Sequence, residues 1–154
     1  MFNALHSLDV VAGARVVDLY AGSGALGIEA LSRGAAHATF VEQSRATVAV
    51  IRANLAATGL ADRATVVVAD AAAWCAASRE RYDLALADPP YAFTGWDALL
   101  AVVPAPFVVA ESNREIAAPA GWGSVRARRY GTTVTTFLEL ASSGPEPGPP
   151  EGNE

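Results

Sequence analysis

The sequence predicts an α/β domain built on a mostly parallel sheet of seven strands, with helices on both faces and a C-terminal antiparallel hairpin. Short apolar stretches alternate with segments of helical periodicity along most of the chain, and this alternation is typical of βαβ units. The apolar stretches are hydrophobic throughout, which indicates strands covered on both faces. Two β-rich runs meet at Gly131 and predict the hairpin.

The elements follow one another in a regular order. Strands are predicted at 15–19, 38–41, 65–68, 82–87, 107–110, 124–130 and 132–140. Helices are predicted at 1–8, 24–33, 44–58, 71–78 and 96–103. Ser44 is placed to cap the third helix and Gly59 to end it. Pro89 and Pro90 force the chain out of the sheet, because neither residue has an N–H for the strand ladder.

The composition fits one domain with a single core. The chain has 154 residues and is 52% hydrophobic, and we expect residues 1–141 to form the domain. The segment 142–154 is rich in proline, glycine and glutamate and is predicted to be disordered. A formal charge of −5 argues against a general nucleic-acid-binding surface.

Cysteine, histidine and hydropathy exclude several classes of protein. A single cysteine cannot form an internal disulfide, so a cytoplasmic location is expected. Two histidines far apart in the sequence show no spacing typical of metal ligands, so no metal is expected. No apolar run approaches the roughly 20 residues needed to span a bilayer, so no membrane partner is expected.

Four acidic residues lie at the carboxyl ends of four successive predicted strands. They are Asp18, Glu42, Asp70 and Asp88. Because the carboxyl ends of parallel strands meet at one edge of a sheet, we expect these side chains to converge. That edge is where ligands bind in open α/β sheets, so the sequence predicts a ligand site there.

The segment 18–27, Asp-Leu-Tyr-Ala-Gly-Ser-Gly-Ala-Leu-Gly, joins the first strand to the second helix. Its glycines satisfy the pattern G-x-G-x-x-G, and Glu42 lies about where a ribose-binding acid is expected. The pattern alone fits both NAD and S-adenosylmethionine. Asp18 favours S-adenosylmethionine, because a carboxylate before the loop would repel a pyrophosphate but attract an α-ammonium group.

Two of the acids have a structural interpretation beside the functional one. Glu42 is expected to accept hydrogen bonds from the ribose hydroxyls, although an acid near a helix N-terminus is also favoured by the dipole. Asp70 is expected to contact the adenine amino group, with the Ala71 N–H beside it, although an aspartate there also fits a helix N-cap.

The segment Asp88-Pro89-Pro90-Tyr91 is the most specific motif. The double proline stiffens the loop, so that the Asp88 carboxylate and a nearby carbonyl can accept hydrogen bonds from one amine. Such acceptors orient the lone pair of an exocyclic amine and stabilise the charge that develops on nitrogen during methyl transfer. Tyr91 can lie flat against a planar base.

Together these motifs resemble those of bacterial small-subunit ribosomal RNA guanine-N2 methyltransferases. The similar segments are 18–27, Glu-Ala-Leu-Ser-Arg-Gly-Ala at 29–35, Val41-Glu42, Asp88 to Tyr91, Phe-Asn-Ala-Leu at 2–5 and Tyr-Gly-Thr-Thr at 130–133. The resemblance covers nearly all of the chain up to about residue 140. Asp-Pro-Pro-Tyr alone is shared with DNA amino-methyltransferases and protein glutamine methyltransferases, and the glycine segment narrows the choice.

The resemblance implies a Rossmann-like class I methyltransferase fold and methyl transfer from S-adenosylmethionine to the N2 amine of a 16S rRNA guanine, leaving S-adenosylhomocysteine. The partner would be 16S rRNA in the small ribosomal subunit or its assembly intermediate. The cofactor-binding residues carried over are Asp18, Tyr20, Ala21, Gly22, Ser23, Gly24, Glu42, Gln43, Asp70 and Ala71. The catalytic residues carried over are Asp88, Pro89, Pro90 and Tyr91. The target guanine must leave any base stack to reach them.

The chain departs from the family at its start. Members carry an upstream basic extension that helps to grip RNA, and this chain is expected to lack it. Arg126, Arg128 and Arg129 form the remaining basic cluster, on the predicted hairpin. We expect this cluster either to contact RNA or to form a solvated strand face.

Two other functions fit the same motifs. One keeps the methyl-transfer chemistry but changes the acceptor to DNA, a protein amide or a small amine. The other is a cofactor-binding ribosome-assembly factor without catalysis. An assay across acceptors distinguishes the first from rRNA methylation, and an Asp88→Ala variant distinguishes the second.

Overall fold

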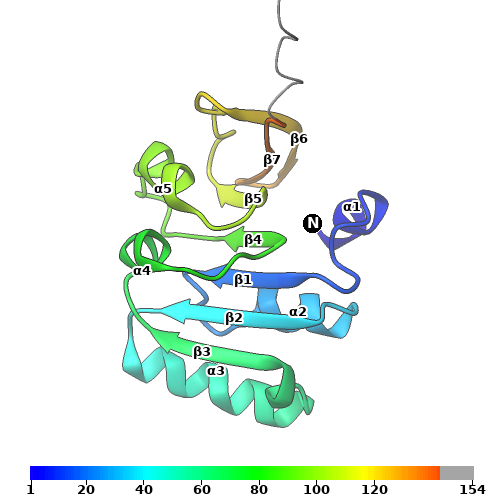
Figure 1. Cartoon of the computed structure of the whole chain (residues 1–154), viewed down its shortest axis with the longest axis vertical. Coiled ribbons are helices and arrows are strands. Elements are labelled where there is room, and N and C mark those ends of the chain that lie inside the picture. Colours follow the sequence, from blue (N-terminus) through cyan, green and yellow to red (C-terminus); the bar gives the residue numbers. More distant parts are fainter. Residues whose placement is uncertain (143–154) are drawn as a thin grey trace, which may run out of the picture.

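The computed structural model describes residues 1–142, so nearly all of the predicted disordered segment 142–154 lies outside the described residues. Its centre is a seven-stranded sheet in the order β3-β2-β1-β4-β5-β7-β6 (Figure 1). The strands are β1 (Arg15–Leu19), β2 (His37–Glu42), β3 (Ala64–Val68), β4 (Leu84–Ala87), β5 (Phe107–Ser112), β6 (Trp122–Tyr130) and β7 (Thr133–Leu140). β1 to β5 are parallel, and β7 runs antiparallel to both β5 and β6. The predicted fold class is confirmed.

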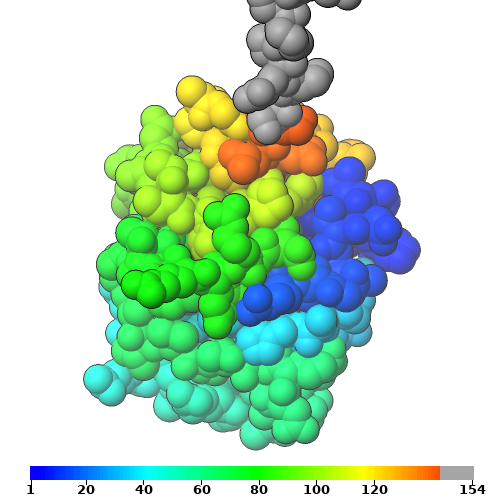
Figure 2. Space-filling model, in the orientation of Figure 1, coloured from blue at the N-terminus to red at the C-terminus, as the bar shows by residue number. Residues whose placement is uncertain are grey.

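Helices cover both faces of the sheet. They are α1 (Phe2–Ser7), α2 (Ala25–Ser32), α3 (Arg45–Thr58), α4 (Ala71–Ala77) and α5 (Trp96–Val102), with a short 3-10 helix η1 (Ala61–Arg63) before β3. One core cluster joins α1, α2 and α3 to the sheet, and a second joins α4 and α5 to its other face. The surface view shows the β6–β7 hairpin at one end of the molecule and α3 at the opposite end (Figure 2).

The order in which successive strands are added to the sheet reverses at β1. It passes outward from β1 to β2 and β3, then returns to place β4 on the other side of β1. Leu19 pairs with Val41 of β2 and with Ala87 of β4. A crevice therefore opens beyond the carboxyl ends of β1 and β4, where this class of sheet binds ligands.

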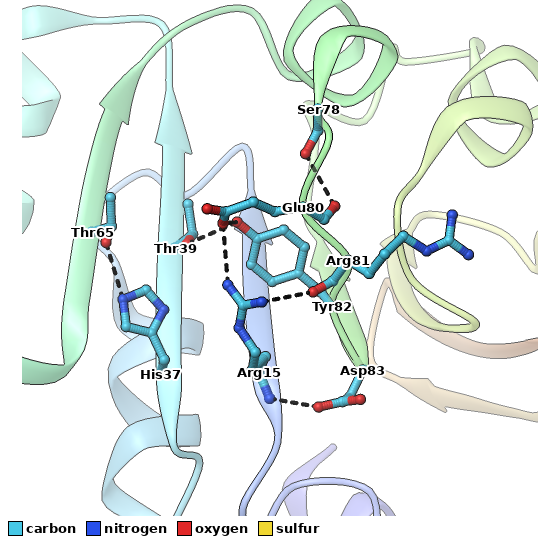
Figure 3. A network of polar contacts seen from close by, with 9 residues as sticks. All are labelled: Arg15, His37, Thr39, Thr65, Ser78, Glu80, Arg81, Tyr82 and Asp83. Atoms are coloured by element: carbon cyan, nitrogen blue, oxygen red, sulfur yellow. Dashed lines mark hydrogen bonds and ion pairs between the residues drawn. The ribbon is translucent and has the colours of Figure 1, made fainter.

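A polar network anchors the chain just before β4 (Figure 3). The Arg15 backbone N–H donates to Asp83 Oδ2 at 2.8 Å, and Arg15 Nη2 pairs with Glu80 Oε2 at 3.1 Å. The Tyr82 hydroxyl donates to Thr39 Oγ1 at 3.2 Å. Regular strand pairing begins at Leu84, two residues later than predicted, and the Arg15 N–H donates to the Asp83 side chain instead of to a strand carbonyl.

Gly27, in the first turn of α2, has no room for a side chain. A Cβ there would lie 2.8 Å from Cζ of the fully buried Phe40 and 3.1 Å from Asp18 Oδ2. We expect Gly27→Ala to lower the free energy of unfolding by about 1–3 kcal/mol through overpacking, although alanine is the better helix former. Urea unfolding measures this loss. In a Phe40→Leu background the loss is expected to shrink, and equal losses in both backgrounds would contradict the proposed clash.

Candidate active site

A cavity of about 590 Å³ opens at the carboxyl ends of the strands. Nine of the predicted site residues line it, namely Tyr20, Glu42, Gln43, Asp70, Ala71, Asp88, Pro89, Pro90 and Tyr91. Val41, Ala69, Glu111 and Thr133 complete the lining. The structure therefore brings the tips of β2, β3 and β4 together, as the positions of the acids predict.

The glycine loop forms a support beside this cavity. Gly22 and Gly24 have φ angles of 57° and 83°, which L side chains rarely adopt, and α2 begins directly after Gly24. The Gly22 N–H donates to Glu42 Oε2 at 3.2 Å, and the Ser44 N–H donates to Glu42 Oε1 at 3.2 Å. Ala21, Gly22, Ser23 and Gly24 are not among the lining residues. Their predicted role at the methionine end of the cofactor stays a prediction.

Asp18 lies behind the lining and is almost completely buried, with 1% of its surface exposed. Its Oδ2 accepts a hydrogen bond from the Gly27 N–H at 2.9 Å. Burial raises the pKa of Asp18 to about 8, against the effect of that hydrogen bond, and the charges of Asp88, Glu42 and Glu111 raise it further. With this pKa Asp18 is not fully ionised at neutral pH, and a cation bound nearby would favour its ionised form. Direct contact stays a prediction.

Asp70 shows the structural role that the sequence left open. Its Oδ2 accepts a hydrogen bond from the Ala73 N–H at 2.9 Å, so it caps α4. The same residue and Ala71 also line the cavity. The N–H groups of a first helical turn have no acceptor within the helix. Those at the start of α4 can therefore also donate a hydrogen bond to an adenine ring.

The Asp88 to Tyr91 segment leaves the sheet directly after β4. The Pro90 carbonyl accepts a hydrogen bond from the Phe93 N–H at 2.8 Å, which closes a turn. The Tyr91 hydroxyl lies 3.0 Å from Thr133 Oγ1 at the start of β7, and 53% of Tyr91 remains exposed. The hairpin thus fixes the outer end of the Tyr91 ring at the cavity.

Glu111 was not among the predicted site residues, although the same rule identifies it. It follows Ala110 of β5 just as Asp88 follows Ala87 of β4, and these two alanines are register partners. The Asp88 and Glu111 carboxyls lie close enough to share a hydrogen bond when one of them is protonated. Burial raises the pKa of both, and the charge of Asp88 raises that of Glu111 further. Thr133 was also missed, and no pattern in the sequence marks it.

The three arginines of the predicted basic cluster lie on β6 but not on one face. Arg126 and Arg128 pair with Phe137 and Thr135, and these partners share the face of β7 that bears Thr133. Arg129 pairs with Val134 and projects to the opposite face. Only Arg126 and Arg128 therefore lie on the face that leads to the cavity.

The lining is acidic. Its ionisable side chains are Tyr20, Tyr91 and the carboxylates of Glu42, Asp70, Asp88 and Glu111, and within residues 1–142 no lysine or arginine lines the cavity. A pyrophosphate would be repelled, whereas an adenosine with a cationic sulfonium fits the charge and the acceptor groups. In the part of the chain that the structure describes, no cluster of His, Cys, Asp and Glu could hold a metal, and no helix could cross a membrane.

Comparisons with known proteins place the chain among methyltransferases. Residues 1–139 match the family described as conserved hypothetical protein 95. The chain is 38% identical over 134 residues to the Bacillus subtilis (strain 168) protein named Putative rRNA methyltransferase YlbH, covering 79% of this chain and 73% of that protein. It is 43% identical over 82 residues to Ribosomal RNA small subunit methyltransferase D of Escherichia coli (strain K12), covering 53% of this chain and 41% of that protein.

Solved structures agree with this placement. The structure of Putative methyltransferase yhhF from Escherichia coli superposes on the chain with a TM-score of 0.79 at 32% sequence identity. The superposition covers 90% of this chain and 81% of that one.

Proposed function

The chain belongs to the family described as conserved hypothetical protein 95, and we propose that it transfers a methyl group from S-adenosylmethionine to the N2 amine of a guanine in 16S rRNA. The family resemblance predicted from the motifs is thus confirmed. Methyl transfer from S-adenosylmethionine, with rRNA as the acceptor, rests on the named relatives. The small-subunit target and the N2 amine are the finer part of the proposal, and we place the reaction in the cytoplasm, where ribosomes assemble.

One observation favours an amine as the methyl acceptor. Asp88 projects from the tip of β4 into a cavity whose charged side chains are all acidic. An amine offers N–H donors to such a site, whereas a carboxylate or phosphate acceptor would be repelled.

The chain's own residues are placed to hold the cofactor. Glu42, fixed by the Gly22 and Ser44 N–H groups, has lone pairs left for the ribose hydroxyls. Asp70 and the Ala71 N–H are placed for the adenine edge. Burial favours the protonated form of Asp18, and the methionine ammonium would favour its ionised form when the cofactor binds. When bound, S-adenosylmethionine supplies an electrophilic methyl group.

Asp88 and the loop orient the amine. The Pro90 carbonyl already accepts from the Phe93 N–H, and we assign the Pro89 carbonyl as the second acceptor beside the Asp88 carboxylate. Two acceptors on the two N–H bonds turn the nitrogen lone pair toward the methyl group and stabilise the positive charge on nitrogen. The methylated ammonium is acidic, so its proton can pass to water without a strong base. Tyr91 stacks on the extruded base in place of the neighbour it has lost.

Methyl labelling tests this function. The full chain is incubated with labelled S-adenosylmethionine and small ribosomal subunits assembled from unmodified 16S rRNA. We expect label in 16S rRNA that co-elutes with N2-methylguanosine after nuclease digestion. Label confined to 23S rRNA, DNA or protein glutamine, or no label in any acceptor, would overturn the proposal.

Arg126 and Arg128 are expected to contact the phosphate backbone of the RNA. Replacing both with alanine should weaken binding to small subunits by about tenfold and lower the slope of log affinity against log salt by about 2. Arg129→Ala is the matched control, because this side chain lies on the opposite face of β6. Affinity is measured by filter binding at several salt concentrations. An equal loss in the Arg129 variant would assign the effect to net charge.

A further inference from the structure

We propose that Glu111 selects guanine by accepting a hydrogen bond from its N1–H, next to the N2 amine held by Asp88. The inference rests on the proposed function and deepens it, because it names the group that distinguishes guanine from the other amino bases. No sequence motif marked Glu111, and the placement of β5 beside β4 brings it into the site.

Strand register places the two carboxylates side by side. β4 and β5 are parallel neighbours, with Leu86 opposite Val109 and Ala87 opposite Ala110. One step further along both strands come Asp88 and Glu111, both of which line the cavity. Their side chains lie close enough to share a hydrogen bond. When Asp88 holds the amine of a base, Glu111 therefore lies next to the ring atom that is adjacent to that amine.

The adjoining ring atom differs between bases. In guanine the carbon that bears the amine is bonded to N1, which carries a proton, so two donors point the same way. In adenine and cytosine the corresponding ring nitrogen, N1 or N3, is an acceptor. Ionised carboxylates only accept hydrogen bonds. A carboxylate pair thus matches guanine and places an acceptor against an acceptor in adenine or cytosine, which leaves buried polar groups unpaired.

In the free site, a proton between the two carboxyl groups takes the place of the two guanine donors. A hydrogen bond between two carboxyl groups requires one shared proton, and burial raises the pKa of both groups, which favours keeping that proton. When guanine binds, this shared proton is released to solvent, and the two N–H donors of the base take its place against two ionised carboxylates. Asp18 also interacts electrostatically with both carboxyls, and it too is acidic. Within the described residues no lining base competes for the two carboxylates.

The test uses 2-aminopurine, which keeps the exocyclic amine of guanine but lacks the N1 proton. The guanine methylated by the wild-type protein is first mapped, and 2-aminopurine is then introduced at that position of the 16S rRNA by ligation. Wild-type protein is expected to methylate guanine roughly 10–100-fold faster than 2-aminopurine. In Glu111→Gln the amide can donate to the bare N1, so the preference should fall to within about threefold of unity. Glu111→Asp keeps an acceptor and should keep the preference.

Each outcome of this test either supports the role of Glu111 or overturns it. Glu115→Gln, an exposed acid beyond β5, is the control and should preserve both rates. If Glu111→Gln slows both substrates equally, Glu111 only supports Asp88 and the inference is overturned. The same holds if the wild type shows no preference. A wild type that labels no guanine at all overturns the proposed function instead. Binding of S-adenosylhomocysteine by each variant, measured by calorimetry, shows that the site is folded.

Discussion

Replacing Asp88 with alanine is expected to lower the rate of methyl transfer by about 10²–10³-fold while leaving cofactor affinity nearly unchanged. The carboxylate acts on the acceptor amine and on the positive charge that forms there, so its loss acts on the transition state. The cofactor contacts assigned to Glu42, Asp70 and Ala71 lie at the end of β2 and at the start of α4 and stay intact. Asp88→Asn keeps an acceptor oxygen without the charge and should retain more activity than alanine.

Single-turnover methylation of small subunits measures the rate, and calorimetry with S-adenosylhomocysteine measures the affinity. Asp97→Ala, an exposed acid in the first turn of α5, serves as the control for removing one negative charge. If Asp88→Ala keeps wild-type rates, Asp88 does not orient the amine. If ribosome assembly in cells depends on the protein but tolerates Asp88→Ala, a non-catalytic assembly role is favoured.

The fold could be predicted from the sequence because the residues that specify each strand, helix and turn lie within that element or next to it. Apolar strands, capping residues such as Ser44 and the hairpin glycine Gly131 each specify a neighbouring stretch of backbone, and parallel strands then leave few arrangements. The convergence of Glu42, Asp70 and Asp88 followed from the same reasoning, because the carboxyl ends of parallel strands share one edge. The structure places all three in one cavity.

The structural features that the sequence did not predict depend on contacts between segments that are distant in the chain. Gly27 fits the glycine pattern, but its φ is not positive, and it is glycine because Phe40 of β2 packs against it. Glu111 pairs with Asp88 only because β5 lies beside β4, and Thr133 holds Tyr91 only because β7 folds back along β5. The deep burial of Asp18 likewise depends on α2 packing over β1, which strand position alone does not specify.

Asp18→Asn is expected to stabilise the protein relative to wild type at alkaline pH. The pKa of Asp18 is raised from 3.8 to about 8 in the folded state, chiefly by burial. Between these values the folded protein holds one more proton than the unfolded chain, so the wild-type free energy of unfolding declines as pH rises toward 8. Asparagine does not titrate, and its side-chain oxygen can still accept the Gly27 N–H. The stability difference between variant and wild type should therefore grow by about 4 kcal/mol between pH 5 and pH 8.

Urea unfolding at pH 5, 6, 7, 8 and 9 measures this difference, which should level off above pH 8, where Asp18 is ionised in both states. Asp88, Glu42 and Glu111 also act on Asp18, but they are present in both proteins, so most of their own titration cancels in the difference. Asp97→Asn, at an exposed position on α5, is the control for replacing an aspartate with an asparagine outside the buried site. A flat difference for Asp18→Asn would mean that the folded protein holds Asp18 ionised, with the Gly27 hydrogen bond outweighing burial. Asp18 would then present a full negative charge to a cofactor ammonium without first losing a proton.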